Sequence, residues 1–170
     1  MLVGTVTGGL KPLDDQHSVL INKGPDRLSA FTIPMLISNM ASGLISMEFG
    51  LRGPNMCIVT ACATSNNAIG EAWRIIKFGD ADIFLAGGSE AALVSIGLAG
   101  FSSMKALSTR HDDPARASRP LDRDRDGFVI IAGAGVVIGE DLEHARARCA
   151  ELYCALARYA VPGDAYPLPA

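Results

Sequence analysis

Apolar positions along the chain fall into two patterns, short continuous runs and stripes at helical spacing. The runs at 2–5, 56–61 and 82–88 predict buried strands, because a strand covered on both faces is apolar throughout. Stripes that repeat every three or four residues predict helices at 13–21, 34–49, from Cys62 to Gly79, and 140–158. Residues 89–107 are expected to form helix plus loop, and 108–126 a polar loop.

Glycines punctuate the later part of this pattern. Gly87-Gly88 is interpreted as a tight turn that ends strand 82–88. Gly133-Ala134-Gly135 indicates a bulge or hairpin within a strand at 128–138. Neither group has the Gly-x-Gly-x-x-Gly spacing of a nucleotide-binding loop. The alternation of strands and helices predicts an α/β protein whose helices cover both faces of a sheet.

Composition and charge narrow the possible functions. The 170 residues are 49% hydrophobic and 19% charged, which is typical of an ordered protein with a large core. A net charge of −3 and a pI near 5.5 argue against nucleic acid as the main partner. No apolar run reaches the roughly 20 residues of a membrane span. The four cysteines, at 57, 62, 149 and 154, do not have the spacing of a metal site. We expect them to be reduced thiols, which favours the cytoplasm or a plastid or mitochondrial matrix.

Cys62 is the candidate nucleophile. It lies between an apolar run and a helix, where free backbone N–H groups and the positive end of the helix dipole favour a thiolate. The small neighbours Ala61, Ala63 and Ser65 would let a substrate carbonyl approach closely. A thiolate in such a place attacks acyl groups. The alternative is a small buried hydrophobe, which is how we interpret Cys57.

A set of separated motifs occurs in order along residues 2–165. The motifs are Asn39-Met40, Gly50-Leu51-Arg52-Gly53-Pro54, Thr60-Ala61-Cys62-Ala63-Thr64-Ser65, Gly79-Asp80-Ala81-Asp82, Ala86-Gly87-Gly88-Ser89-Glu90, Gly100-Phe101, Ala106-Leu107-Ser108-Thr109-Arg110, Ala117-Ser118-Arg119-Pro120, Arg125-Asp126-Gly127-Phe128-Val129 and Glu143-His144-Ala145. Together they resemble the β-ketoacyl-acyl-carrier-protein synthases, the elongating condensing enzymes of the thiolase-like superfamily. The resemblance implies a layered α-β-α-β-α fold of two duplicated halves. Residues 1–160 would form most of the N-terminal half and 161–170 an irregular tail.

The resemblance also implies roles for particular residues. Cys62 would accept an acyl chain from acyl carrier protein, with its own backbone N–H as half of an oxyanion hole. Malonyl carrier protein would then lose carbon dioxide, and its carbanion would attack the acyl thioester. Phe101 matches a phenylalanine of the acyl channel, and Arg27 and Lys105 match residues that dock the acidic carrier. A homodimer with no metal and no organic cofactor is implied.

Departures from the family pattern leave other functions open. The sequence ends at Ala170 before any match to the two histidines and the lysine of the second half, and Ile131-Ala132 replaces a glycine-acid pair. Pro167 stands where relatives have a histidine. An alternative is therefore a non-catalytic truncated subunit or paralogue that only dimerises with a full-length synthase. A cysteine hydrolase is disfavoured, since no motif places a base among His17, His111 and His144.

Overall fold

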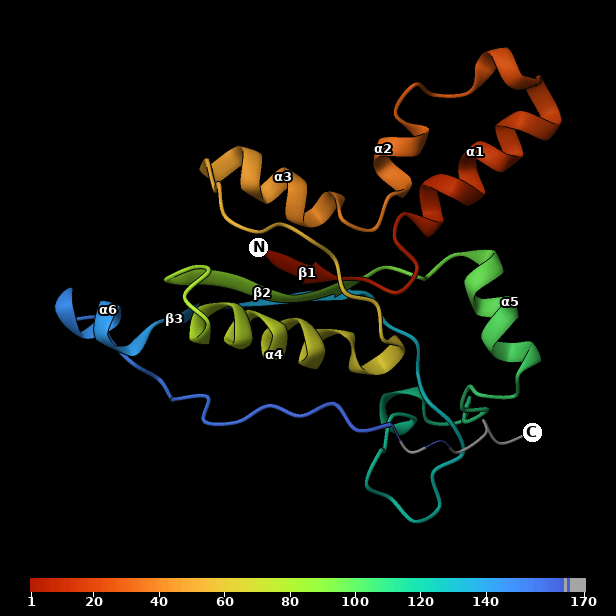
Figure 1. The fold of residues 1–170 in the computed structure, drawn as a ribbon. Helices are drawn as coiled ribbons and strands as arrows, with labels where there is room; N and C mark the ends of the chain where they lie inside the picture. Colours follow the sequence, from red (N-terminus) through yellow and green to blue (C-terminus); the bar gives the residue numbers. More distant parts are fainter. Residues whose placement is uncertain (164, 166–170) are drawn as a thin grey trace.

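A three-stranded mixed sheet forms the centre of the protein. The computed structural model describes residues 1–163 and 165. The strands, in sheet order, are β1 (Leu2–Gly4), β2 (Ile83–Glu90) and β3 (Gly133–Glu140). β1 runs parallel to β2, with Val3 opposite Gly87, and β3 runs antiparallel to β2, with Ile138 opposite Leu85 (Figure 1). Both β1 and β3 are therefore edge strands within the described part of the chain.

Helices lie on both sides of this sheet. They are α1 (Leu10–Lys23), α2 (Thr32–Leu36), α3 (Met40–Phe49), α4 (Thr64–Lys77), α5 (Ser95–Ser103) and α6 (Leu142–Ala147). α4 covers one face, α3 lies on the opposite side, and α1 and α2 pack together away from the sheet (Figure 1). This arrangement confirms the predicted α/β layering, with α4 close to its expected bounds.

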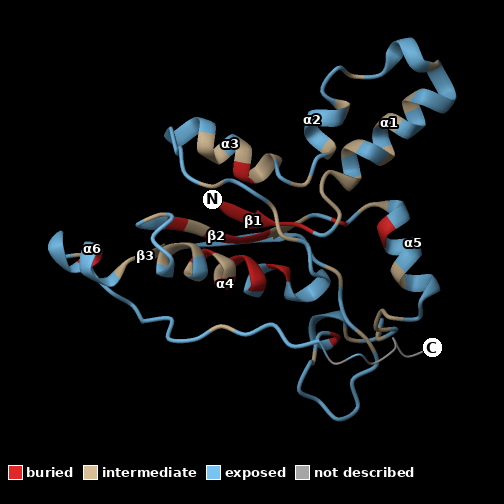
Figure 2. Cartoon of the chain, in the orientation of Figure 1, coloured by how far each residue is buried: buried red, intermediate tan, exposed pale blue. Residues whose placement is uncertain are grey.

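The core lies between the sheet and α4. Buried residues cluster on β1, β2 and α4, which carry most of the red in Figure 2. The cluster consists of Leu2, Ala68, Ala72, Phe84 and Ala86, with Ile58, Ile69, Ile75, Ile76 and Ala81 packed against it. The alanines let α4 approach the strands closely enough for Phe84 to be 2% exposed. Burial of these apolar groups fixes the position of α4, and hence of its N-terminus, over the sheet.

A buried serine joins α3 to the sheet. Ser42 on α3 has no exposed surface, and its hydroxyl accepts a hydrogen bond from Val3 N (2.8 Å). The same hydroxyl donates to Met56 O (3.1 Å), in the segment that leads to Cys62. One side chain thus satisfies two backbone groups on different segments.

Other apolar surface is left uncovered. Val136, Val137 and Ile138 on β3 are 43%, 50% and 68% exposed. The α1 helix contributes no buried residue, and the α1–α2 region is mostly pale blue in Figure 2. Exposed apolar patches of this kind are typical of surfaces that bind protein, membrane or ligand.

Two predictions about strands are wrong. The segment 56–61 is not a strand: only Met56 forms a bridge, to Leu2, because the Ser42 hydroxyl bonds both Val3 N and Met56 O in place of a direct bond between them. Gly87-Gly88 is not a turn but lies within β2. A Cβ atom on Gly87 would lie 2.8 Å from Val136 Cα and closer still to Gly135 O, so the glycine serves close strand approach.

Three further element boundaries are also corrected. The helix expected at 34–49 is interrupted between α2 and α3. The Gly133-Ala134-Gly135 segment pairs with β2 in continuous register, without the expected bulge or hairpin. The helix expected at 140–158 ends at Ala147, and Cys149 takes φ +55°. Leu152 and Leu156 beyond it are about half exposed and lack the apolar partner that a longer helix needs. Pro167 and most of the expected tail lie outside the described residues.

Candidate active site

The chain turns sharply at Cys62. A 3-10 turn, Ala61–Ala63, leads directly into α4, and the exposed Cys62 is its central residue. Gly4 and Gly88, near the carboxyl ends of β1 and β2, leave room for Thr64 and Ser65 of α4. The thiol is therefore accessible, two residues from a helix N-terminus and at the carboxyl end of two parallel strands. Ligand sites of α/β sheets occupy this edge.

The peptide group between Ala61 and Cys62 is held in one orientation. Ala61 has φ +48°, an uncommon value for a residue with a side chain. Its carbonyl oxygen accepts hydrogen bonds from Thr64 Oγ1 (2.7 Å) and from Thr64 N. Because the peptide is trans, its N–H points opposite to its C=O and away from α4. No acceptor for the Cys62 N–H is found among residues 1–163 and 165, so this donor is available to an oxyanion.

Two threonines on either side of the cysteine stabilise the turn. Thr64 is buried, and its hydroxyl accepts from Thr60 N (2.9 Å) while it donates to Ala61 O. Neither Thr60 nor Thr64 is among the functional residues predicted from the sequence. Hydroxyl residues that flank a turn ahead of a helix are a recognisable signal, since they commonly bond to nearby backbone groups.

Phe101 belongs to an aromatic pair. It is half-buried on α5, with its ring edge-to-face against Phe128 at a centroid distance of 5.4 Å and an interplanar angle of 81°. Phe128 is held by a hydrogen bond from its N–H to Ala106 O (3.0 Å). Phe101 thus packs against Phe128, and its place in an acyl channel beside Cys62 stays a prediction.

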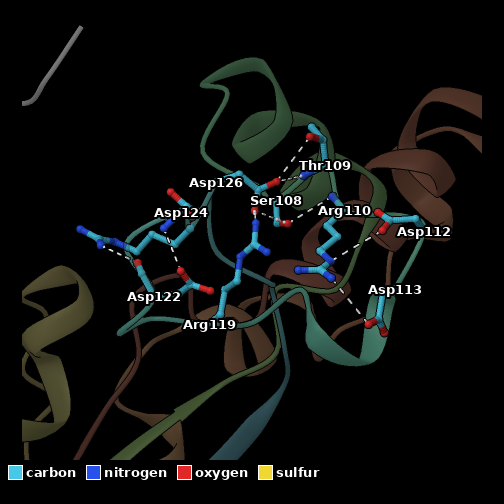
Figure 3. Close-up of polar contacts among 10 residues, drawn as sticks. Ser108, Thr109, Arg110, Asp112, Asp113, Arg119, Asp122, Asp124 and Asp126 are labelled. Atoms are coloured by element: carbon cyan, nitrogen blue, oxygen red, sulfur yellow. Dashed lines mark hydrogen bonds and ion pairs between the residues drawn. The ribbon is translucent and has the colours of Figure 1, made fainter.

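Hydrogen bonds and an ion pair, all to Asp126, stabilise the loop that precedes Phe128 (Figure 3). Asp126 accepts hydrogen bonds from Ser108 Oγ (2.8 Å) and Thr109 N (2.9 Å), and Arg119 Nη2 lies 3.3 Å away. The Ser108 bond, then the Thr109 bond, lowers the pKa of Asp126 below its usual range. The carboxylate remains charged at neutral pH and joins the two ends of the loop beside the aromatic pair.

The two expected docking residues lie on different segments. Arg27 ends an exposed 3-10 turn, Pro25–Arg27, between α1 and α2. Lys105 follows α5 with φ +55°, and its N–H donates to Ser102 O (2.9 Å). Both side chains are exposed, and neither forms an ion pair within the part of the chain that the structure describes. Their role in carrier docking stays a prediction.

Comparisons with known proteins identify the family of the chain. The family model "Beta-ketoacyl synthase, N-terminal domain" matches residues 1–145. The 3-oxoacyl-[acyl-carrier-protein] synthase 2 of a Synechocystis strain is 52% identical over 170 residues, which are 100% of this chain and 41% of that protein. The enzyme of the same name from Rhizobium meliloti is 50% identical over 171 residues, with the same coverage. The chain thus spans about two-fifths of the length of these relatives.

Solved structures give the same result. A type II polyketide ketosynthase, bound to the hexaketide and in complex with its acyl-carrier protein, superposes with a TM-score of 0.83 at 31% identity, over 89% of this chain and 39% of that chain. A β-ketoacyl synthase from Burkholderia phymatum gives a TM-score of 0.78 at 30% identity, over 88% of this chain and 37% of that chain.

Among the described residues, no helix combines the length and the apolar character needed to cross a bilayer.

The chain belongs to the β-ketoacyl synthase family, and its Synechocystis and Rhizobium relatives are named 3-oxoacyl-[acyl-carrier-protein] synthases. Its α/β fold is thiolase-like and corresponds to part of the complete architecture, 39% and 37% of the two ketosynthase chains.

Proposed function

We propose that Cys62 is the acyl acceptor of a β-ketoacyl-acyl-carrier-protein synthase. Residues 1–160 would form one half of the complete fold, with 161–170 as a tail. The observation that carries the proposal is the turn at Cys62, which combines an exposed thiol, an available backbone donor and a helix N-terminus in three consecutive residues. Each of these features assists acyl transfer to sulfur.

The loading step needs only these groups. The Cys62 thiolate attacks the carbonyl carbon of an acyl thioester and forms a new C–S bond. The negative charge that develops on the carbonyl oxygen is stabilised by the Cys62 N–H, whose direction Thr64 fixes through Ala61 O. The tetrahedral intermediate collapses with loss of the carrier's pantetheine thiolate, which takes up a proton. The acyl chain is then a thioester of Cys62.

Condensation would complete the reaction. Malonyl carrier protein loses carbon dioxide, and the resulting carbanion attacks the Cys62 thioester. A new C–C bond forms, the Cys62 thiolate leaves, and the product is a 3-oxoacyl carrier protein. The family resemblance assigns assistance of decarboxylation to histidines outside residues 1–170. Arg27 and Lys105 would attract the acidic carrier during both steps.

Intact-mass measurement tests the loading step. The purified chain is incubated with acyl-loaded acyl carrier protein, and we expect its mass to increase by one acyl group. Cys62→Ala should abolish the increase. Cys149→Ala is the matched control, because Cys149 is also an exposed thiol but lies beyond α6, and this variant should load normally. Wild-type protein that is folded but remains unmodified would contradict the proposal.

The second candidate is a subunit that only dimerises with a full-length relative. The uncovered apolar side chains of β3 favour it, since such surface is normally packed against other protein. Ile131, which is 71% exposed, adds apolar surface just before this strand. Under this hypothesis the chain forms a stable heterodimer with a full-length synthase but gains no acyl mass. Light scattering of the chain alone also tests the homodimer that we expect for the first candidate.

A further inference from the structure

A tyrosine far along the sequence contacts the helix that follows Cys62. The ring of Tyr159 lies against Gly70 on α4, where a Cβ atom would collide with it. Its hydroxyl donates to Asn67 Oδ1 (3.2 Å) and approaches Asn67 O (3.4 Å). The pKa of Tyr159 is raised, mainly by burial and secondly by the negative charge of Glu71. The phenol is therefore protonated at neutral pH and can donate a hydrogen bond. The contact joins residues 92 positions apart.

Asn67 connects Tyr159 to the turn that contains Cys62. It is a buried residue of α4, and its Nδ2 donates to Thr60 Oγ1 at 2.7 Å. The amide therefore uses its oxygen for Tyr159 and its nitrogen for Thr60, and its orientation follows from the two partners. A buried amide that is paired on both sides has little freedom to rotate.

From Thr60 the hydrogen bonds continue to the peptide group before Cys62. Thr60 N donates to Thr64 Oγ1 (2.9 Å), and Thr64 Oγ1 donates to Ala61 O (2.7 Å). The series thus begins at the Tyr159 hydroxyl and ends at the carbonyl whose peptide partner is the Cys62 N–H. Ala61 at φ +48° is in a region that a side chain disfavours, so its conformation depends on such external restraints.

We propose that Tyr159, acting through Asn67 and Thr60, is a positioning residue that holds the Ala61–Cys62 peptide in the orientation needed for acyl transfer. The proposal rests on the function proposed above, because it assigns the Cys62 N–H to the oxyanion. Tyr159 touches neither the thiol nor the substrate in this scheme. Without the Tyr159 hydroxyl, the Asn67 amide can rotate and Thr60 loses a fixed partner. The Cys62 N–H then samples a wider range of orientations.

Paired variants test the proposal in single-turnover acylation of the chain by a small acyl-pantetheine thioester. Tyr159→Phe removes only the hydroxyl and should slow acylation about fivefold to tenfold, the factor expected for one ordinary hydrogen bond lost from the reactive arrangement. Tyr153→Phe is the matched control: Tyr153 is 93% exposed, and this variant should acylate at the wild-type rate. Thr60→Val should slow acylation likewise, and Thr60→Ser should restore it.

A merely structural role would give a different result. Tyr159→Phe would then lower the free energy of unfolding but leave the acylation rate of the folded molecules equal to that of Tyr153→Phe, and this outcome would overturn the proposal. Failure of Thr60→Ser to recover the rate of Thr60→Val would also overturn it.

Amide hydrogen exchange separates this proposal from the proposed function. The Ala63 N–H donates to Thr60 O (3.0 Å) and therefore reports on the turn without any substrate. Its exchange should become faster in Tyr159→Phe and Thr60→Val but not in Tyr153→Phe or Thr60→Ser. If wild-type protein is never acylated, the proposed function fails, and equal exchange in all four variants would independently refute the positioning role.

Discussion

The contact between β2 and β3 at Gly87 allows a quantitative test of the sheet. A methyl group in Gly87→Ala would lie 2.8 Å from Val136 Cα and nearer to Gly135 O. Real Cβ atoms essentially never come within 3.0 Å of another heavy atom, so the backbone of β3 must move away. Gly87 is buried and centrally paired in β2, and no flexible side chain can yield instead.

The expected cost follows from overpacking. Forcing an extra methyl group into a packed interior costs about 1–3 kcal/mol, and displacement of a strand belongs at the upper end, about 3 kcal/mol. Domains of this size are stable by only about 5–15 kcal/mol, so the loss is readily measured. Gly133→Ala is the matched control, because Gly133 pairs with Glu90 in the same two strands and its Cβ would meet nothing within 4 Å.

Urea unfolding, followed by the fluorescence of Trp73, provides the assay. This tryptophan is the only one in the chain and lies on α4, which packs on the sheet. We expect the midpoint of Gly87→Ala to fall markedly and that of Gly133→Ala to change little. Equal midpoints for the two variants would refute the inference that Gly87 is needed for close strand approach.

Three other predictions concern a buried hydrogen bond, a titrating carboxyl group and the docking of the carrier. Ser42→Ala leaves the buried Val3 N–H and the partly buried Met56 carbonyl without their partner and should lower the free energy of unfolding by about 2 kcal/mol in the same urea assay. Desolvation raises the pKa of Glu90, but hydrogen bonds, first from the Thr7 hydroxyl, outweigh it and lower the pKa below 4.5. The free energy of unfolding of wild type should therefore exceed that of Glu90→Gln by its full amount at neutral pH, and the difference should shrink as the pH falls below 4.5. A difference that does not change with pH would contradict the lowered pKa of Glu90. Arg27→Glu and Lys105→Glu should each slow loading from acyl carrier protein about tenfold without affecting loading from the small thioester, and equal slowing of both would exclude a docking role.

Much of the fold follows from local patterns. The α4 helix was predictable because its apolar residues repeat at helical spacing and Gly79 ends it. The apolar run of β2 likewise indicates a buried strand. By contrast, the run at 56–61 has the composition of a strand but finds only one pairing position, on Leu2. Composition does not reveal whether a partner edge is available.

The errors at glycines and at the late helix have a common cause. Gly87 reads as a turn residue in sequence, yet the space that it leaves is occupied by the backbone of β3, which is almost fifty residues further along the chain. The apolar stripe after Ala147 has the spacing of a helix, but no surface within the described residues covers it. Both outcomes depend on tertiary contacts.

Local sequence patterns account for part of the candidate site, and tertiary contacts determine the rest. The position of Cys62 just before α4 was predictable because the apolar stripe of the helix begins beside it, and its role as nucleophile stays a proposal. The link between Tyr159 and Asn67 joins two segments that only folding brings together. The threonines beside Cys62 fall between these cases, since their hydroxyls bond locally.

The central claim is that acyl groups are transferred to Cys62 and to no other thiol. Peptide mapping by mass spectrometry, after brief incubation with acyl carrier protein, tests this directly, because Cys149 and Cys154 are also exposed and compete on equal terms. We expect the acyl group on the peptide that contains Cys62. Acylation spread over the exposed thiols, or confined to Cys149 or Cys154, would contradict it.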